Sequence, residues 1–572
     1  MTATLTGQGA APGVAMGRPF TVAPPVTAVP DPGPTGPPAI EKSRLREALA
    51  QAATELHGLA ERMRVAAGGD AEIFEAHAAF AEDPELAEQA GSLIDAGQSA
   101  IAAVAAAFGT FRELLAASDN EYLAARAADL DDVAARVVAI LCGASRAVDL
   151  PDEPCIVVAR ELTPSQTAEM PRERIAAIAT ETGSPTSHAA ILARTLGIPA
   201  VVGVSGLLKV TEGARRLAVD GRTGDVHVDP DDQIVETIAA RAASEAARRA
   251  ELEDVRHEPG RTADGVPIEL VANIAGRGEL AAAIDAGAEG AGLVRTELLF
   301  QDRRTEPTVD EQHAYYLEVL DAFGDKRVVF RTLDIGADKP MPFVAREQEP
   351  NPALGLRGIR LSLRRPKLFE NQLRALLRAH RDRAVAGPIG IMFPLVSRVE
   401  EVQAARSELQ RVADDEGIDL AGVEVGVMIE VPSAALAAER LAPMVDFMSI
   451  GTNDLLQYLY AVDRLVAEVA ELVEVCEPVV LDLIAGVTAA GDRHGAWVGV
   501  CGETASDPEV AGALVGLGVR ELSMVTGALG EVKSLLRRHD LATLQQAAQA
   551  ACAAPDAAQA RRVLQTALGR PG

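Results

Sequence analysis

The sequence has few aromatic residues, no excess of positive charge, no paired cysteines and no long apolar run. Aromatic side chains make up 3% of its 572 residues, so its cores must be built from Ala, Val, Leu and Ile. It carries 54 Lys and Arg against 83 Asp and Glu, a net charge of −29. Because polyanions repel such a chain, we expect neither nucleic acid nor an anionic membrane surface as a partner.

The cysteine pattern excludes a disulfide framework and a zinc site. The five cysteines are odd in number, far apart and never in a CxxC pair. The chain does not open on a basic segment followed by an apolar one, and its most apolar stretch, at 101–108, is too short to span a bilayer. We therefore expect a cytoplasmic protein without membrane insertion.

The N-terminal part of the sequence changes character twice. Residues 24–38 are rich in Pro and Gly, which indicates an extended linker. Residues 41 to about 141 are rich in Ala and Leu, with charges at helical spacing, and predict a bundle of about four helices. Short apolar runs such as CIVVA, IAAIAT and DVHVDP then predict a small mixed α/β domain with one helix at 187–196.

The C-terminal part alternates strand and helix patterns. It follows residues 231–258, which lack Gly and Pro and predict a solvated connecting helix. The predicted strands are IELVAN, AGLVR, RVVFR, IGIMF, EVGVMIE, DFMSI, AWVGV and RELSM. Eight such strands, each followed by a helical segment, predict a (β/α)₈ barrel with its chemistry at the carboxyl ends of the strands.

We therefore expect a multidomain α/β fold. Residues 1–21 and 145–230 would form the mixed α/β domain, into which the helical domain at 22–144 is inserted. A helical linker at 231–260 would lead to the TIM barrel at 261–572.

Charged residues end or follow the predicted barrel strands. Arg295 and Arg331, with Arg464 beyond the sixth strand, present guanidinium forks that suit phosphate and carboxylate oxygens. Glu430 and Asp454 can supply two carboxylate oxygens to an octahedral Mg²⁺. A metal among arginines indicates phosphoryl chemistry on a small polyanion.

Two nucleophilic side chains accompany this ring. Cys501 follows the seventh predicted strand, where a thiol can exchange a proton with an enolate; the alternative is a small buried hydrophobe. His188 falls in the first turn of a predicted helix, whose dipole lowers the pKa of an imidazole and attracts an anion. A neutral, nucleophilic histidine can accept a phosphoryl group; the alternative is a capping or core histidine.

These motifs resemble those of a known family. GSPTSHAAILAR resembles the phosphohistidine signature of the phosphoenolpyruvate-utilising enzymes. GLVRTELLF, FRTLDIGADK, NPALGLRGIR, GVMIEVPSA, DFMSIGTNDLLQY and GVCGETASDP resemble the barrel motifs of that family. The order of segments is similar to the Enzyme I family of the bacterial phosphotransferase system (PTS), the phosphoenolpyruvate–protein phosphotransferases, and the match covers essentially the whole chain.

The resemblance implies a reaction and its partners. Phosphoenolpyruvate would donate its phosphoryl group to His188, leaving pyruvate, and His188 would pass it to a histidine of the carrier protein HPr as the first step of sugar uptake. The α/β domain would swivel on the linker, and the helical domain would bind HPr. The family also forms a homodimer through its barrel, which we expect here.

The resemblance further implies a role for each site residue. The substrate contacts would be Arg295, Arg331, Asn453, Asp454 and Arg464. The Mg²⁺ ligands would be Glu430 and Asp454, and Cys501 would protonate the enolate.

One departure keeps an alternative function open. After Arg464 the family has a His-Pro stretch, whereas this sequence has CEP at 476–478. A catalytically weak regulatory paralogue that binds phosphoenolpyruvate or PTS partners is therefore the alternative. A phosphoenolpyruvate synthase or dikinase would need a large nucleotide-binding domain ahead of His188, and we expect none in so short a stretch.

Overall fold

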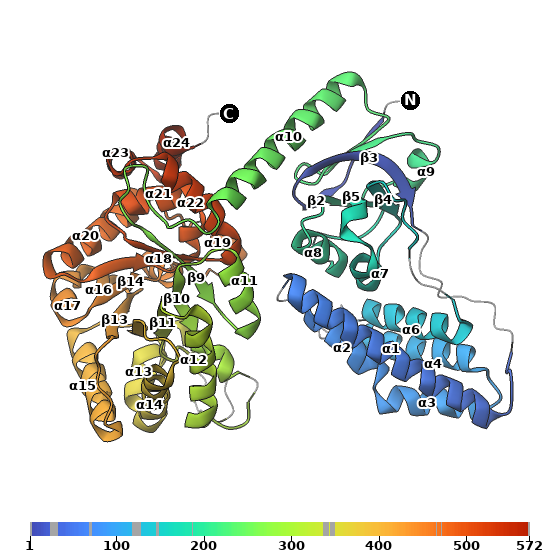
Figure 1. Cartoon of the computed structure of the whole chain (residues 1–572), viewed down its shortest axis with the longest axis horizontal. Coiled ribbons are helices and arrows are strands. Elements are labelled where there is room, and N and C mark those ends of the chain that lie inside the picture. The colour runs from blue at the N-terminus through green and yellow to red at the C-terminus, as the bar shows by residue number, and fades with distance from the viewer. Residues whose placement is uncertain are drawn as a thin grey trace. The chain divides into compact units, whose positions relative to one another are not determined.

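The computed structural model describes residues 3–22, 33–67, 71–116, 127–144, 148–185, 187–301, 303–335, 343, 349–464, 466–470 and 472–569. The chain forms two compact units, residues 1–249 and 250–572 (Figure 1). Most of the linker predicted at 24–38 lies outside the described residues.

An eight-stranded sheet forms the centre of the first unit. Its strand order is β1-β8-β7-β3-β4-β5-β6-β2. The strands are β1 (Ala3–Thr6), β2 (Gln8–Ala11), β3 (Val14–Thr21), β4 (Cys155–Ala159), β5 (Ile175–Thr180), β6 (Ala200–Val202), β7 (Leu217–Asp220) and β8 (Asp225–Val228). Strands β3, β4, β5 and β6 are parallel neighbours, and the other pairs are antiparallel. Every residue of β4 is buried, as its apolar sequence CIVVA predicts for a central strand.

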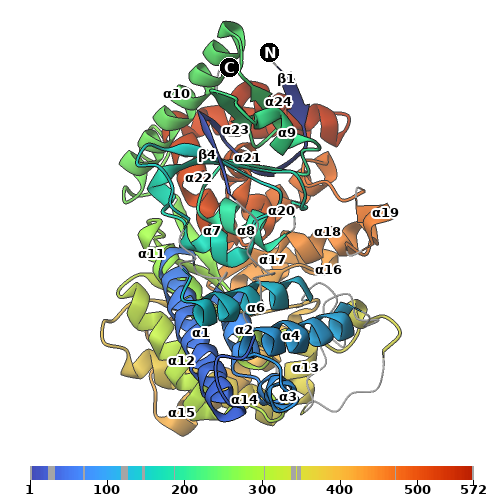
Figure 2. The same ribbon diagram turned by 90° about the vertical axis from the view of Figure 1, so that its right-hand side faces the viewer.

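The helical segment is inserted between the neighbouring strands β3 and β4. In its described part we find five helices, one more than about four expected: α1 (Pro38–Ala67), α2 (Ala71–Ala81), α3 (Pro84–Asp95), α4 (Ala100–Ala116) and α6 (Ala127–Cys142). They lie side by side around a core that includes Leu56, Phe74 and Val104 (Figure 2). The short helix α3 is separate because Asp83 caps it, accepting hydrogen bonds from the N–H groups of Glu85 and Leu86.

Three short helices, α7 (Pro164–Glu169), α8 (His188–Thr195) and α9 (Leu207–Thr211), accompany the sheet. Helix α8 packs on two cores at once. Its Leu192 belongs to the core of the helical segment, whereas Ala190 and Ala193 belong to a core of the sheet. The N-terminus of α8 is therefore fixed by packing on both sides, and the Ser187 hydroxyl caps it by accepting from the Ala190 N–H.

Helix α10 (Asp232–Val255) runs from the first unit into the second. Within it only Ile238 is buried, as expected for a solvated connecting helix. Arg241 pairs with Asp220 of β7 at 2.6 Å, and Glu251 accepts a hydrogen bond from the Ser534 hydroxyl. Each end of α10 is thus attached to a different unit.

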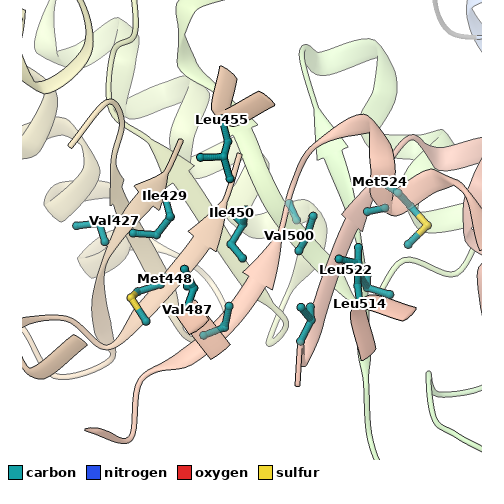
Figure 3. Packing of buried hydrophobic residues seen from close by; sticks show 14 of the residues in the cluster. Val427, Ile429, Met448, Ile450, Leu455, Val487, Val500, Leu514, Leu522 and Met524 are labelled. Carbon is teal, nitrogen blue, oxygen red and sulfur yellow. The ribbon is translucent and has the colours of Figure 1, made fainter. Parts of the chain in front are cut away.

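The second unit is a closed barrel of eight parallel strands, and all eight were predicted. In chain order they are β9 (Glu269–Ile274), β10 (Gly290–Arg295), β11 (Arg327–Arg331), β12 (Ile389–Phe393), β13 (Val423–Ile429), β14 (Phe447–Ile450), β15 (Trp497–Val500) and β16 (Glu521–Met524). Apolar side chains of neighbouring strands, among them Ile429, Ile450 and Val500, form a continuous core (Figure 3). The fold class expected from the sequence is confirmed.

Helices surround the barrel. They are α11 (Leu280–Asp285), α12 (Val309–Phe323), α13 (Gly358–Arg364), α14 (Pro366–Asp382), α15 (Val399–Glu416), α16 (Pro432–Leu436), α17 (Ala438–Leu441), α18 (Thr452–Tyr460), α19 (Ala467–Ala470), α20 (Pro478–His494), α21 (Pro508–Gly516), α22 (Leu529–Arg538), α23 (Leu541–Cys552) and α24 (Ala557–Leu568). Within the described parts of the chain, no helix combines the length and apolar character needed to cross a bilayer.

Candidate active site

A cavity of about 320 Å³ opens at the carboxyl ends of the barrel strands. All the barrel residues that the sequence singled out line it: Arg295, Arg331, Glu430, Asn453, Asp454, Arg464 and Cys501. They follow five different strands, and the barrel brings them together because parallel strands present their carboxyl ends on one face. His188 is not among them, since it begins α8 in the other unit.

Two arginines in this cavity are held by buried carboxylates. Arg331 donates to Glu297 Oε1 at 3.0 Å, and its Nη1 lies 3.6 Å from Asp334 Oδ2. Burial disfavours the charge of Arg331, but the carboxylates of Glu297 and Asp334 outweigh this effect and raise the pKa of the guanidinium. Arg357 forms a two-pronged pair with Asp334, at 3.0 and 2.7 Å. Both guanidinium groups are therefore permanently charged and fixed in orientation.

Asp454 lies close to Arg357 and to a third arginine, Arg464. Its Oδ2 accepts from Arg357 at 3.3 Å, and its Oδ1 lies 3.7 Å from Arg464 Nη1. Oδ1 is buried and has no hydrogen-bond partner within the described structure. A carboxylate oxygen in that position is free to bind a ligand that enters the cavity.

Glu430 is the most deeply buried carboxylate of the cavity, at 1% exposure. Its Oε1 accepts a hydrogen bond from the Leu395 N–H at 2.6 Å. Burial, together with repulsion from Asp454 and Asp334, raises the pKa of Glu430 well above its ordinary value. Glu430 and Asp454 could together hold a divalent cation, which would offset the repulsion on Glu430 when it binds.

Cys501 provides the thiol of the cavity and is 4% exposed. Its Sγ lies 3.7 Å from the Ile450 carbonyl oxygen. Burial raises the pKa of this thiol to about 11, so it carries its proton at neutral pH. In this state Cys501 can donate a proton but is a poor nucleophile.

The loops after β14 and β15 are in direct contact. Asn453 Nδ2 donates to Glu503 Oε1 at 3.2 Å, and the Glu503 N–H donates back to Asn453 Oδ1 at 3.2 Å. The Thr452 and Thr504 hydroxyl groups lie 2.9 Å apart. Asn453 and Cys501 are therefore positioned by one shared set of contacts between these two loops.

Four further residues line the cavity that were given no role at the sequence level: Glu297, Asp334, Arg357 and Glu503. Tyr458, which was missed, accepts a hydrogen bond from Arg357 at 3.2 Å. The signal for Arg357 was present in NPALGLRGIR, a motif noted for its resemblance but given no role. Glu297 and Asp334 pair with Arg331, and only the tertiary structure shows that these pairs form.

Family models of the phosphoenolpyruvate-utilising enzymes match three parts of the chain. The model for the PEP-binding domain matches residues 249–541, the model for the mobile domain matches 151–224, and the N-terminal model matches 6–126. The barrel and these matches together define a phosphoenolpyruvate-utilising enzyme.

Similar proteins with known names indicate which family of phosphoenolpyruvate-utilising enzymes the chain belongs to. The phosphoenolpyruvate-protein phosphotransferase of Streptomyces coelicolor is 42% identical, over 99% of this chain and 100% of its own length. The protein of that name from Haloferax volcanii is 42% identical, over 91% of this chain and 92% of its own length. A solution structure titled Enzyme I (nEIt) is 35% identical, over 42% of this chain and 99% of that chain, with a TM-score of 0.35. The chain belongs to the phosphoenolpyruvate-protein phosphotransferase family of enzymes, which confirms the resemblance of its motifs.

Proposed function

We propose that this enzyme transfers the phosphoryl group of phosphoenolpyruvate to its own His188 and then to a histidine of an HPr carrier protein, releasing pyruvate at the start of PTS sugar uptake. The observation that carries the proposal is one cavity lined by fixed arginines, the carboxylates of Glu430 and Asp454 and the thiol of Cys501. Such a cavity suits a small substrate that has both a phosphate and a carboxylate.

In this proposal the arginines bind the substrate oxygens. Arg295, Arg331 and Arg464 line the cavity, and Asn453 offers an amide beside them. Arg331 is held by Glu297, so its fork is oriented before the substrate arrives. Positive charge fixed around a phosphoryl group also stabilises the charge that spreads over its oxygens during transfer.

Glu430 and Asp454 would hold Mg²⁺. Two observations support this assignment: both carboxylates line the same cavity, and Oδ1 of Asp454 is buried without a hydrogen-bond partner among the described residues. Among the residues that the structure describes, no cluster of three or more His, Cys, Asp or Glu side chains could hold a metal. Mg²⁺ suits a two-carboxylate site because it keeps several waters and substrate oxygens as ligands. When bound, the ion would neutralise phosphate charge.

Cys501 would complete the reaction as an acid. Attack by the His188 ring on phosphorus breaks the bond between phosphorus and the bridging oxygen, and the electron pair stays on that oxygen as an enolate. The enolate carbon then takes the Cys501 proton and becomes the methyl group of pyruvate. The pKa of about 11 supports this role, because the thiol retains its proton until a strong base forms beside it.

His188 and the cavity belong to different units, so the proposal requires domain movement. The solvated helix α10 supports a swivel of residues 1–21 and 145–230 about the linker at 231–260. The helical domain at 22–144 would bind HPr; it has 8 Lys and Arg against 19 Asp and Glu, a net charge of −11 that suits a basic partner surface. A homodimer through the barrel at 261–572 and a cytoplasmic location belong to the same proposal, supported by family membership.

The test is incubation with phosphoenolpyruvate and Mg²⁺ in the absence of ATP. We expect an acid-labile phosphoryl group confined to the peptide that contains His188, which HPr then removes. The His188→Ala variant should bind phosphoenolpyruvate and form no adduct. Binding without an adduct in the wild-type protein would instead support the regulatory paralogue, and a normally active His188→Ala variant would exclude the mechanism.

A further inference from the structure

We infer that Glu297 is a positioning residue for the reaction: it sets the orientation of the Arg331 guanidinium through one carboxylate oxygen. Glu297 lies in the 3₁₀ turn Thr296–Leu299 directly after β10 and is 6% exposed. Its Oε1 accepts two hydrogen bonds of 3.0 Å, from Arg331 Nη2 and from the Asp334 N–H. One oxygen therefore joins the side chain that ends β11 to the backbone that follows it.

The other contacts of Arg331 are weaker. Nη1 lies 3.8 Å from the sulfur of Met428 and 3.6 Å from Asp334 Oδ2. Its Nε is buried and has no hydrogen-bond partner within the described part of the chain. Without Glu297, these contacts would leave the plane of the guanidinium weakly defined, although its positive charge would remain in the cavity.

The turn that carries Glu297 is itself fixed. The Thr296 hydroxyl donates to the Arg331 carbonyl oxygen at 2.9 Å, and Gln372 of α14 donates to that hydroxyl at 3.1 Å. Gln372 also accepts from the Leu333 N–H at 2.9 Å. The segments after β10 and β11 are thus joined by hydrogen bonds through Thr296, which precedes Glu297, and through Gln372, so the Glu297 carboxylate is a preorganised acceptor.

The surroundings of the second carboxylate oxygen of Glu297 allow its hydrogen-bonding role to be tested separately from its charge. Oε2 is buried and has no hydrogen-bond partner among the described residues. A glutamine could therefore present its one oxygen to Arg331 and to the Asp334 N–H, and place its NH₂ group where Oε2 now lies. If Glu297 acts by positioning Arg331, the Glu297→Gln variant should keep the reaction rate. If it acts by neutralising buried charge, the Gln variant should lose rate as the Ala variant does.

The role of Glu297 rests on the proposed function of the cavity, and it is tested by single-turnover release of pyruvate from phosphoenolpyruvate with Mg²⁺. For Glu297→Ala we expect the maximal rate to fall about 100-fold, because a misplaced clamp costs about that much. The phosphoenolpyruvate concentration for half-saturation should rise less than the rate falls, since the charge of Arg331 is retained. Glu297→Gln should stay within about threefold of the wild-type rate.

Glu289 offers a matched control away from the cavity. Like Glu297 it accepts two hydrogen bonds, here from the backbone N–H groups of Gly260 at 3.0 Å and Leu270 at 2.9 Å, but it precedes β10 at the opposite end of the barrel. Glu289→Ala should lower the unfolding temperature and leave both kinetic quantities unchanged.

The outcomes separate the two hypotheses. A wild-type protein that releases no pyruvate contradicts the proposed function itself. An active wild type with Gln and Ala variants equally impaired overturns the positioning role, as does an Ala variant of normal rate. If Glu297→Ala does not fold, the Glu297→Gln variant is compared with the wild type. A positioning role requires that this variant release pyruvate at close to the wild-type rate, and a slow Gln variant overturns the role.

Discussion

At the scale of single residues, the barrel carries buried charge at both of its ends. The end opposite the cavity holds Arg327, which pairs with Glu269 and with Glu424 Oε2 at 3.0 Å. Its guanidinium also lies 4.7 Å from the centre of the Trp497 ring. Close by, Glu521 is 1% exposed, and neither of its carboxylate oxygens has a hydrogen-bond partner within the described structure. This buried carboxyl lowers stability whenever it is charged.

Glu521 should make the stability of the barrel depend on pH. Burial and the neighbouring Glu269 raise its pKa from 4.5 to about 8 in the folded protein. Because the folded value exceeds the unfolded one, the stabilising effect of its proton is complete below pH 4.5 and is lost as the pH rises through about 8. Glu521 alone should thus lower the free energy of unfolding by up to about 1.4 kcal/mol per pH unit in that window.

The measurement is urea unfolding at pH 5 to 8, followed by the fluorescence of Trp497, the only tryptophan of the chain. Glu521→Gln should remove this part of the pH dependence and be the more stable protein at pH 8. Parallel curves for the two proteins would show that Glu521 ionises normally in the fold.

Cys501 gives the second residue-scale prediction. Cys501→Ala removes the proposed proton donor but none of the cations that bind the substrate. We expect pyruvate formation to slow about 10²- to 10⁴-fold, with little change in the affinity for phosphoenolpyruvate. Rapid-quench measurement of pyruvate beside equilibrium binding checks this, and equal losses of rate and affinity would contradict an acid role.

At the scale of elements, the cavity depends on how closely the loops after β14 and β15 approach each other. A Cβ on Gly502 would lie 1.7 Å from Thr452 Oγ1 and 3.0 Å from the Thr452 nitrogen. Only glycine therefore allows the two loops to meet. The glycine is required for space rather than for backbone conformation, since its φ is −83°.

Gly502→Ala should displace one of these loops and with it Asn453 or Cys501. We expect single-turnover pyruvate release to fall about tenfold or more. Gly527, in the turn after β16, is the control, because a Cβ there would meet nothing within 4 Å. A Gly502→Ala variant that matches Gly527→Ala in rate would show that the loop contact is dispensable.

The strands also show which parts of the fold could be predicted from the sequence. All eight barrel strands were predicted because each is a short apolar run that the barrel buries. Strands β1, β2 and β3 were not predicted. β1 and β2 are short and partly exposed, β2 is built from Gln, Gly and Ala, and β3 contains Gly, Arg and Pro. Residues at strand ends could be named from their chemistry, whereas the pairing of Arg331 with Glu297 depends on the contact of two strands, which the sequence does not display.

At the scale of the whole molecule, the two units should be separable in function. If the chain is produced as two pieces, 1–230 and 231–572, the second piece should bind phosphoenolpyruvate and release no pyruvate. Adding the first piece should restore release at a rate proportional to its concentration, whereas the rate of the intact chain should not depend on concentration.

The control is a first piece that carries His188→Ala, which should restore nothing. Stoichiometric release of pyruvate by residues 231–572 alone would mean that the barrel contains its own phosphoryl acceptor and would contradict the role of His188.

The insertion of the helical segment between β3 and β4 has a consequence for how this enzyme can diversify. The chain leaves the sheet at Thr21 and returns at Cys155, and the two strands pair in parallel over Arg18–Thr21 and Cys155–Val158. Because the sheet itself holds both ends of the insert together, exchanging the insert for one of another length adds little to the entropy of closing that loop. The inserted helical segment could therefore be exchanged between relatives while the pairing of β3 with β4 stays unchanged.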